Sequence, residues 1–445
     1  MSKLMSELIN KSGSQSLRPA NPAPTLKRTF VGALALSAVV SAPLVVASGS
    51  TSTNDSAWLP DWSLEAGVEG RRFISDGAYP GQVDDQWSIT LEPEFVWDID
   101  NSRFTFTPYY RHDFADDERT HADVREAMFM TYDGAWELRA GIGRVFWGVT
   151  ESLHLVDVVN QTDLVESVDG EEKLGQPMIQ GIWLSELGTF EAFVLPGFRE
   201  RTFAGEAGRF RSPLVVSDDA QYQASDEDAH IDLAARWSMT TELSGYPLDV
   251  TASVFRGTSR DPLFVPQTQV VNNQLVVTGL TPYYALQNQV GSTLQFAPEG
   301  WLLKAELLYR DIQQDLLLGV GDIDDQFAVV GGFEYTLVGP FDTAADLGLL
   351  MEYQFDSRDT AIAQNDLFVG ARYVVNDMAS SEVLMGVTQD LDNGSERLFV
   401  VEGSTRLNPS TTLDLTLVGV TGNAESQLAP LRRDDMAELS LTFFF

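Results

Sequence analysis

The chain contains no cysteine and only four histidines among its 445 residues. The absence of cysteine excludes disulfides, thiolate zinc sites and covalent haem attachment. Basic residues are also scarce, with 29 Lys and Arg against 65 Asp and Glu, which gives a net charge of −36. Nucleic acid is excluded as a partner on this ground, because phosphate binding needs clustered Lys and Arg. The acidic excess is compatible with divalent cations as partners.

Long apolar runs are missing after residue 47, where none approaches the ~18 consecutive apolar residues of a transmembrane helix. The one long run, 30–47, follows two basic residues and ends in the small-residue sequence Val45-Val46-Ala47. This order is typical of a cleaved signal peptide. A membrane-spanning helix is the alternative, but the run is short for one and Pro43 interrupts it. We therefore expect a signal peptide at 1–47 and export by the general secretory route.

What the chain does have, from Asp61 onward, is alternation of apolar and polar residues in segments of ~10–14 residues bounded by turn residues. The sequence WSITLEPEFVW at 87–97 places aromatic and aliphatic residues on one face and Ser, Thr and Glu on the other. A soluble sandwich also alternates, but its strands are typically ~5–6 residues long. The longer segments fit a tilted membrane crossing, and Trp, Tyr and Phe recur at the ends of the apolar faces, as interfacial girdles require.

The connections between these segments alternate in length. Short turns fall near 99–102, 133–134, 187–188, 298–299, 338–343, 377–379 and 408–410. Longer polar links lie near 75–85, 114–121, 148–176, 200–227, 258–282, 314–323, 357–365 and 421–433. Short turns on one side and long loops on the other are typical of outer-membrane barrels, with the turns in the periplasm. We predict an all-β, antiparallel transmembrane barrel of about 18 strands over 61–445, with about 16 as the alternative, after a short periplasmic leader at 48–60.

The last residues also alternate, so that Leu441, Phe443 and Phe445 share one apolar face. This pattern resembles the C-terminal signal of Gram-negative outer-membrane β-barrels, which the barrel assembly machinery reads. Over 61–445 the chain resembles porin-like outer-membrane proteins. The resemblance implies the outer membrane of a Gram-negative bacterium as location, and diffusion of small polar or ionic solutes through the lumen. We expect no cofactor and no bound metal, because the chain has no cysteine and its four histidines are not spaced as metal ligands.

The link at 148–176 is the third long one, and the third extracellular loop of general porins folds into the barrel and narrows it. Apolar residues such as Leu155, Val156 and Val159 would pack against the barrel wall. The polar residues expected to face the pore are Glu151, His154, Asp157, Asp163 and Glu166. Their acidic excess favours cations over anions. A loop that caps the outside, or contacts a neighbouring subunit, is the alternative.

Polar positions of the strands should face the lumen, because a barrel of about 18 strands is too wide for its side chains to fill. The candidates for lining the pore are Glu92, Glu94, Arg111, Arg139, Lys304, Glu306 and Arg310. Opposite charges at neighbouring lumen positions set a transverse field in many channels. The alternative for each residue is that it only keeps the interior hydrated and pairs with its neighbours.

We expect a cation-preferring channel and no enzyme. Ser152 and His154 have the two-residue spacing of outer-membrane phospholipases, but in reverse order and in a link rather than a strand. A transporter dedicated to a polysaccharide, an oligosaccharide or another single substrate is one alternative, and a surface-structural or adhesion barrel is another. The expected partners are outer-membrane lipid, lipopolysaccharide, the assembly machinery and small polar solutes. A homo-oligomer is left open.

Overall fold

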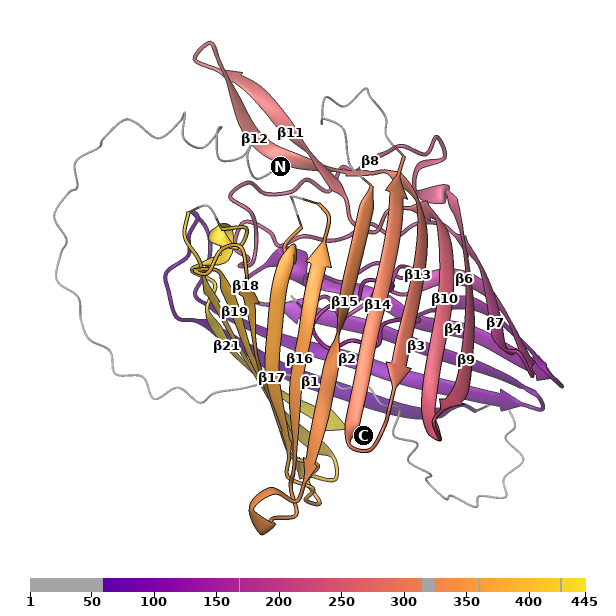
Figure 1. Cartoon of the computed structure of the whole chain (residues 1–445). Coiled ribbons are helices and arrows are strands. Elements are labelled where there is room, and N and C mark those ends of the chain that lie inside the picture. Colours follow the sequence, from indigo (N-terminus) through magenta and orange to yellow (C-terminus); the bar gives the residue numbers. More distant parts are fainter. Residues whose placement is uncertain (1–58, 168, 314–324, 359–360, 425) are drawn as a thin grey trace.

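The computed structural model describes residues 59–167, 169–313, 325–358, 361–424 and 426–445. The expected signal peptide at 1–47 lies outside these residues, as does the leader up to residue 58. Eighteen strands form one antiparallel sheet, and the last strand pairs with the first, so the sheet closes into a barrel (Figure 1). The barrel strands are β1 (Asp61–Phe73), β2 (Asp85–Ile99), β3 (Ser102–Asp113), β4 (His121–Asp133), β5 (Trp136–Gly143), β6 (Gln176–Ser185), β7 (Gly188–Pro196), β9 (Ile231–Leu243), β10 (Tyr246–Thr258), β13 (Leu286–Phe296), β14 (Trp301–Ile312), β15 (Gln326–Val338), β16 (Asp346–Asp356), β17 (Asn365–Val374), β18 (Glu382–Asp390), β19 (Arg397–Asn408), β20 (Thr411–Thr421) and β21 (Met436–Phe444). The predicted fold is confirmed, with 18 strands rather than 16.

The connections are short at the lower end of Figure 1 and long at the upper end, as the sequence predicts. One short turn was not predicted, at Ser244 and Gly245, where both residues have positive φ. The described parts of the connections contain four 3₁₀ turns: η1 (Asp117–Arg119), η2 (Glu227–Ala229), η4 (Pro340–Asp342) and η5 (Ala429–Leu431). Within the described ranges, no helix combines the length and the apolar character needed to cross a membrane.

Three further strands make a small separate sheet above the barrel: β8 (Gln221–Tyr222), β11 (Leu263–Val271) and β12 (Gln274–Tyr284). β11 and β12 form a hairpin that projects from the upper end in Figure 1, and β8 pairs with the base of β12. The long link predicted near 258–282 is present between β10 and β13, but it contains a hairpin that the sequence analysis did not predict. Asn272 and Asn273 both have positive φ and form the two-residue turn that favours a tight hairpin.

The outward face of the barrel is apolar. On β14, Leu303, Leu307 and Tyr309 are exposed, whereas Glu306 and Leu308 between them are buried inside the barrel. The same alternation runs through the other barrel strands, so the exposed apolar surface encircles the molecule. Soluble monomers rarely expose a contiguous apolar patch above a few hundred Å². The outer face is therefore built for contact with lipid.

Aromatic side chains of neighbouring strands meet near the lower turns. The ring of Trp136 stacks on that of Trp183 with centroids 5.6 Å apart, and Phe190 continues the row at 5.4 Å from Trp183. On the other side of the barrel, the rings of Trp301 and Tyr335 lie 4.5 Å apart. Such rings, apolar in body and polar at one edge, suit a boundary between lipid and water.

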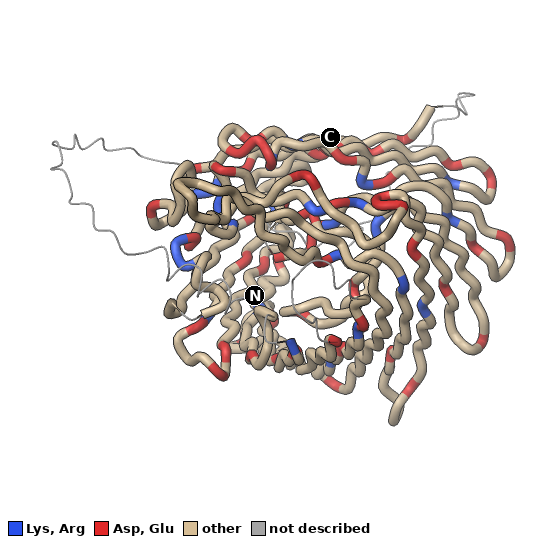
Figure 2. Tube along the Cα trace, turned by 90° about the horizontal axis from the view of Figure 1, so that it is seen from above, with Lys and Arg blue, Asp and Glu red and all other residues tan. Residues whose placement is uncertain are grey.

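The main buried core lies inside the barrel, because the connection between β5 and β6 enters the lumen. We call residues 144–175 the inner loop. Its valines Val156, Val158 and Val159 pack on buried side chains of strands β4 to β10. The wall residues of this cluster, on β4, β6, β7, β9 and β10, are Met128, Met178, Phe193, Leu195, Ala234 and Phe255. Leu155 packs in the other direction, against Leu308, Ala328 and Val330 on β14 and β15. Figure 2 shows chain inside the ring of strands, with charged residues of both signs.

Candidate functional site

Glu306, in the middle of β14, anchors the start of the inner loop. Its side chain is 0% exposed, and Oε1 accepts hydrogen bonds from the main-chain N–H groups of Val149 at 2.6 Å and Thr150 at 3.1 Å. The Thr150 hydroxyl donates to the same oxygen at 2.8 Å, and the Val156 N–H donates to Oε2 at 3.2 Å. Buried N–H groups need such partners, so the carboxylate fixes the course of the loop. Glu306 holds the loop and does not line open water, contrary to the expectation from the sequence.

Glu352 on β16 provides a second anchor next to the first. Its carboxylate accepts hydrogen bonds from the N–H groups of Glu151 at 2.9 Å and Ser152 at 2.8 Å, and from the Ser152 hydroxyl at 2.5 Å. The Ser152 hydroxyl thus donates its hydrogen bond to Glu352. The ring of His154 contacts Phe146 instead, with ring centres 4.7 Å apart. Within the described chain the serine and the histidine do not form a nucleophile–base pair.

The side chain of Glu151 is held by two basic residues of the wall. Lys304 Nζ lies 3.5 Å from one carboxylate oxygen, and Arg372 on β17 donates a hydrogen bond to the other. Glu151 and Lys304, both predicted to face the pore, thus contact each other between the inner loop and the wall. The negative charge of Glu151 is therefore largely neutralised by Lys304 and Arg372.

A buried charge cluster fixes the far end of the inner loop to β1 and β3. The Glu166 carboxylate accepts hydrogen bonds from the Tyr109 hydroxyl at 2.5 Å and from Arg111 Nε at 2.8 Å. Arg111 also pairs with Glu69 at 2.9 Å, and Arg119 donates to Glu69 at 2.6 Å. All five side chains are buried. Glu166 and Arg111 therefore lie between loop and wall, and do not face the pore as the sequence suggested, because the loop itself fills the lumen there.

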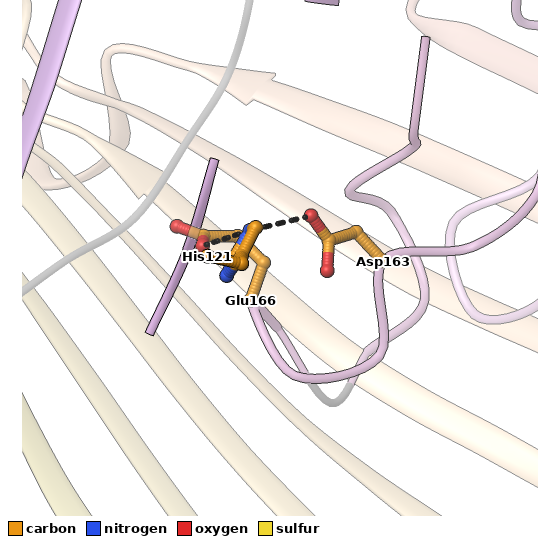
Figure 3. Close-up of side chains that lie close together, drawn as sticks. All are labelled: His121, Asp163 and Glu166. Atoms are coloured by element: carbon orange, nitrogen blue, oxygen red, sulfur yellow. Dashed lines mark ion pairs between the residues drawn. The ribbon is translucent and has the colours of Figure 1, made fainter. Parts of the chain in front are cut away.

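His121, Asp163 and Glu166 lie together in this cluster (Figure 3). His121 Nε2 is 3.3 Å from Asp163 and 3.8 Å from Glu166, and Nδ1 is 3.0 Å from the main-chain oxygen of Arg119. One imidazole and two carboxylates within 4.8 Å can in general hold a metal ion. Here the Glu166 oxygens already accept from Arg111, whose positive charge opposes a dication. The geometry fits an ion-pair cluster better than a metal site.

Two more residues of the inner loop are paired within the protein. Asp157 is buried and lies 3.1 Å from Lys173 Nζ. His154 Nε2 lies 3.7 Å from the Glu171 carboxylate. Burial alone would lower the pKa of His154, but the neighbouring Glu171 and Glu306 carboxylates raise it above its usual value. His154 therefore binds its proton more tightly than a free imidazole does.

The remaining predicted wall residues lie apart from one another. Glu92 pairs with Arg125 at 2.9 Å, and Arg139 pairs with its strand neighbour Glu137 at 2.5 Å. Glu94 forms no ion pair with any residue in the described part of the chain. Most predicted wall charges are thus matched locally.

Arg310 belongs to a second positive region near the upper end of the lumen. It lies 3.2 Å from the Asp261 carboxylate, which Arg201 also contacts at 3.0 Å. Burial by itself would raise the pKa of Asp261, but the two guanidinium groups hold it well below its usual range. Asp261 therefore stays ionised and compensates both arginines.

Sequence reasoning missed a group of three carboxylates that the basic residues do not neutralise. Glu402 on β19 lies in the field of Asp169 and Glu171 at the tip of the inner loop. Glu171 remains 54% exposed in its side chain. No Lys or Arg in the described ranges lies within ion-pair distance of these three carboxylates. The acidic sequence Asp169-Gly170-Glu171-Glu172 was the available signal, but its position opposite Glu402 depends on how the loop folds.

No protein-family model matches the chain, and no curated protein matches it in sequence. Among solved structures, a mutant of Rh. blastica porin is 14% identical, with 87% of this chain and 100% of that chain covered and a TM-score of 0.41. Pseudomonas putida OprB is 12% identical, with 87% of this chain and 94% of that chain covered and a TM-score of 0.42. The fold of this chain rests on its own strand pairing and register.

Proposed function

We propose that this protein is a porin-like channel in a Gram-negative outer membrane, through which small polar or ionic solutes diffuse, with cations preferred. The closed barrel supports the membrane location, since only closed barrels and helices satisfy all backbone hydrogen bonds in lipid. The apolar outward face and its aromatic ends support the same location. The unequal connections at the two ends support loops outside and turns in the periplasm.

The inner loop is the proposed constriction. The single observation that carries this is its attachment on two sides of the lumen. Val156 packs toward β4–β10, and Leu155 packs toward β14 and β15. The carboxylates of Glu306 and Glu352 fix the chain at 149–152, just before these contacts. A loop held in this way across the lumen narrows the path that a solute takes.

The proposed preference for cations rests on the distribution of unmatched charge. Arg111, Arg310 and Lys304 are each paired with a carboxylate. Around the loop tip, Glu402 and Glu171 have no Lys or Arg pair among the described residues. Carboxylates without a Lys or Arg partner would give this part of the lumen an excess of negative charge when ionised, which would attract cations and repel anions.

A liposome-swelling assay tests this proposal. Proteoliposomes are exposed to a small cationic solute, a neutral sugar and an anionic solute of similar size. Entry in the order cation, neutral solute, anion supports the proposal. Equal entry of all three would contradict the charge preference, and no entry would contradict the channel.

An adhesion or surface-structural role is the second candidate, and one observation favours it. The β11–β12 hairpin exposes aliphatic side chains beyond the barrel, with Val270 71% and Leu275 72% exposed. A barrel that folds correctly but admits no solute would shift the assignment to this surface. A channel dedicated to an acidic polymer is less well supported, because Arg111 and Tyr109 are buried and do not line an open path.

A further inference from the structure

Four arginines from two distant connections gather at one corner of the upper end. Arg209 and Arg211 belong to the connection after β7, and Arg432 and Arg433 belong to the connection between β20 and β21. Arg209 donates a hydrogen bond to the main-chain oxygen of Arg433. The guanidinium of Arg211 lies 5.2 Å from the centre of the Tyr79 ring. In a chain with net charge −36, this is an unusual concentration of positive charge.

Arg209 is compensated within the protein. It is buried, and it pairs with Asp434 at 2.8 Å and with Asp84 at 3.1 Å. The nearby Arg199 and Arg201 are likewise each paired with an aspartate. These pairs are the ordinary arrangement for guanidinium groups that lose contact with water.

Arg211 departs from this arrangement. It is only 8% exposed, and its terminal nitrogens donate to the main-chain oxygens of Ser212 at 3.0 Å, Glu206 at 3.1 Å and Pro80 at 3.3 Å. Its Nε is buried and has no hydrogen-bond partner. No carboxylate of the described residues lies within ion-pair distance. Arg211 lies in the field of Asp434, which already pairs with Arg209, but it forms no ion pair of its own, so an anion bound nearby would be favoured.

A pocket of about 490 Å³ is lined in part by Tyr79, the residue whose ring Arg211 contacts. Its lining consists of Ala78, Tyr79, Ala429, Pro430, Arg432 and Arg433. Arg432 donates to the main-chain oxygens of Ala429 and Gly422, and neither Arg432 nor Arg433 pairs with a carboxylate of the described residues. The volume is in the range of small-ligand sites. The aromatic and aliphatic lining suits the carbon face of a sugar, and guanidinium groups suit phosphate.

We propose that this pocket binds a phosphorylated sugar, with Arg432 and Arg433 contacting the phosphate and Tyr79 contacting the ring. The positive charge of Arg211, whose guanidinium lies over the Tyr79 ring, adds to that of Arg432 and Arg433. Two sources supply this chemistry: a soluble sugar phosphate, or the phosphorylated sugar headgroup of an outer-leaflet glycolipid. The lining residues belong to connections and not to barrel strands, so the proposal does not rest on the proposed channel.

The test is calorimetric titration of the full-length protein in neutral detergent, freed of bound glycolipid. The probes are glucose, glucose 6-phosphate, lipopolysaccharide and dephosphorylated lipopolysaccharide. The variant is the double substitution Arg432→Gln and Arg433→Gln. Arg397→Gln is the matched control, because Arg397 is exposed at the same end and bonds to Gln389 rather than to a carboxylate. Retained heat-modifiability of each variant shows that the barrel has folded.

The proposal predicts that a phosphorylated probe binds and its unphosphorylated counterpart does not. The double variant should bind about tenfold more weakly or worse, which corresponds to about 1.4 kcal/mol or more, and Arg397→Gln should bind as the unmodified protein does. Binding of glucose 6-phosphate identifies a soluble ligand, whereas binding of lipopolysaccharide alone identifies the lipid headgroup. Equal binding of glucose and glucose 6-phosphate, an unaffected double variant, or no binding of any probe at low salt would overturn the proposal.

Discussion

Thr150 of the inner loop donates both its main-chain N–H and its hydroxyl to the same oxygen of Glu306 on the barrel wall, at 3.1 and 2.8 Å. This relationship explains why a charged residue lies fully buried inside the barrel. The carboxylate satisfies backbone donors that the loop exposes where it leaves the wall. Loop and wall are thereby joined by a charge-assisted contact.

Replacing Glu306 by glutamine should loosen the inner loop. The amide keeps one acceptor oxygen, but its NH₂ group would face donors of the loop, which costs about 1–3 kcal/mol. We expect larger or noisier single-channel conductance than in the unmodified protein. The matched control is Glu334→Gln on β15, since Glu334 makes no hydrogen bond to the loop among those described. Identical traces for Glu306→Gln and the unmodified protein would show that this anchor does not set the pore size.

Replacing Glu166 by glutamine should lower the stability of the barrel. The change leaves Arg111 buried with a weakened counter-charge, and breaking a buried pair costs about 3–5 kcal/mol. The temperature at which the folded band disappears in heat-modifiability gels should fall. Glu137→Gln serves as the control, because Glu137 pairs with Arg139 at a partly exposed site, where a pair is worth about 0–1 kcal/mol. Equal transition temperatures for the two variants would argue against a structural role of the buried cluster.

Two charge changes in the lumen should shift ion selectivity in opposite directions. Glu402→Gln removes one of the unmatched carboxylates and should reduce the preference for cations. Arg372→Gln frees the Glu151 carboxylate from one of its two basic partners and should increase it. Reversal potentials across a salt gradient measure both effects. Shifts of the same sign in both variants would contradict this charge assignment.

The contact between His154 and Glu171 should depend on pH. The pKa of His154 is raised in the folded protein. The stabilisation from this pair is therefore fully present below the ordinary histidine value of about 6.5, and it is lost as pH rises through the folded pKa. Channel noise should increase as the pH rises above about 6.5, because the pKa of His154 is shifted upward from that value. His154→Gln should remove this pH dependence, and a variant that retains it would assign the effect to another group.

Replacing Phe445 by aspartate should reduce the amount of assembled barrel in outer membranes. The Phe445 N–H donates to Leu64 O at 2.9 Å, and the Leu64 N–H donates to Phe445 O at 3.2 Å, where the last strand closes on the first. The assembly signal at Leu441, Phe443 and Phe445 remains a prediction, and quantitative immunoblotting of membrane fractions tests it. Val338→Asp is the control, because Val338 is 82% exposed at a turn. Undiminished assembly with Phe445→Asp would refute the signal.

The barrel could be predicted from the sequence because its physical cause is local. The alternation of apolar and polar residues at 87–97 is the pattern expected for a strand with lipid on one side and water on the other. Each strand shows this pattern in its own sequence, without reference to the rest of the chain. The hairpin at β11–β12 was missed because the apolar and polar residues of its two strands, such as Val and Gln, do not alternate regularly. The consecutive residues Asn272 and Asn273 were a turn signal that could have revealed it.

The site could be predicted only in part. Alternation assigns Glu306 and Arg111 to the inner side of the wall, and the structure agrees with this. It does not tell whether water or protein occupies the lumen next to them, since that depends on where the inner loop packs. The opposition of Glu402 and Glu171 likewise joins residues far apart in sequence. Such contacts follow from tertiary packing and leave no local pattern.

The measurement that tests the central claim most directly is single-channel conductance of the refolded protein in planar bilayers, with reversal potentials across a salt gradient. The proposed channel predicts steady conductance steps and a reversal potential of the sign for cation selectivity. A correctly folded barrel that shows no conductance, or that selects anions, would contradict it.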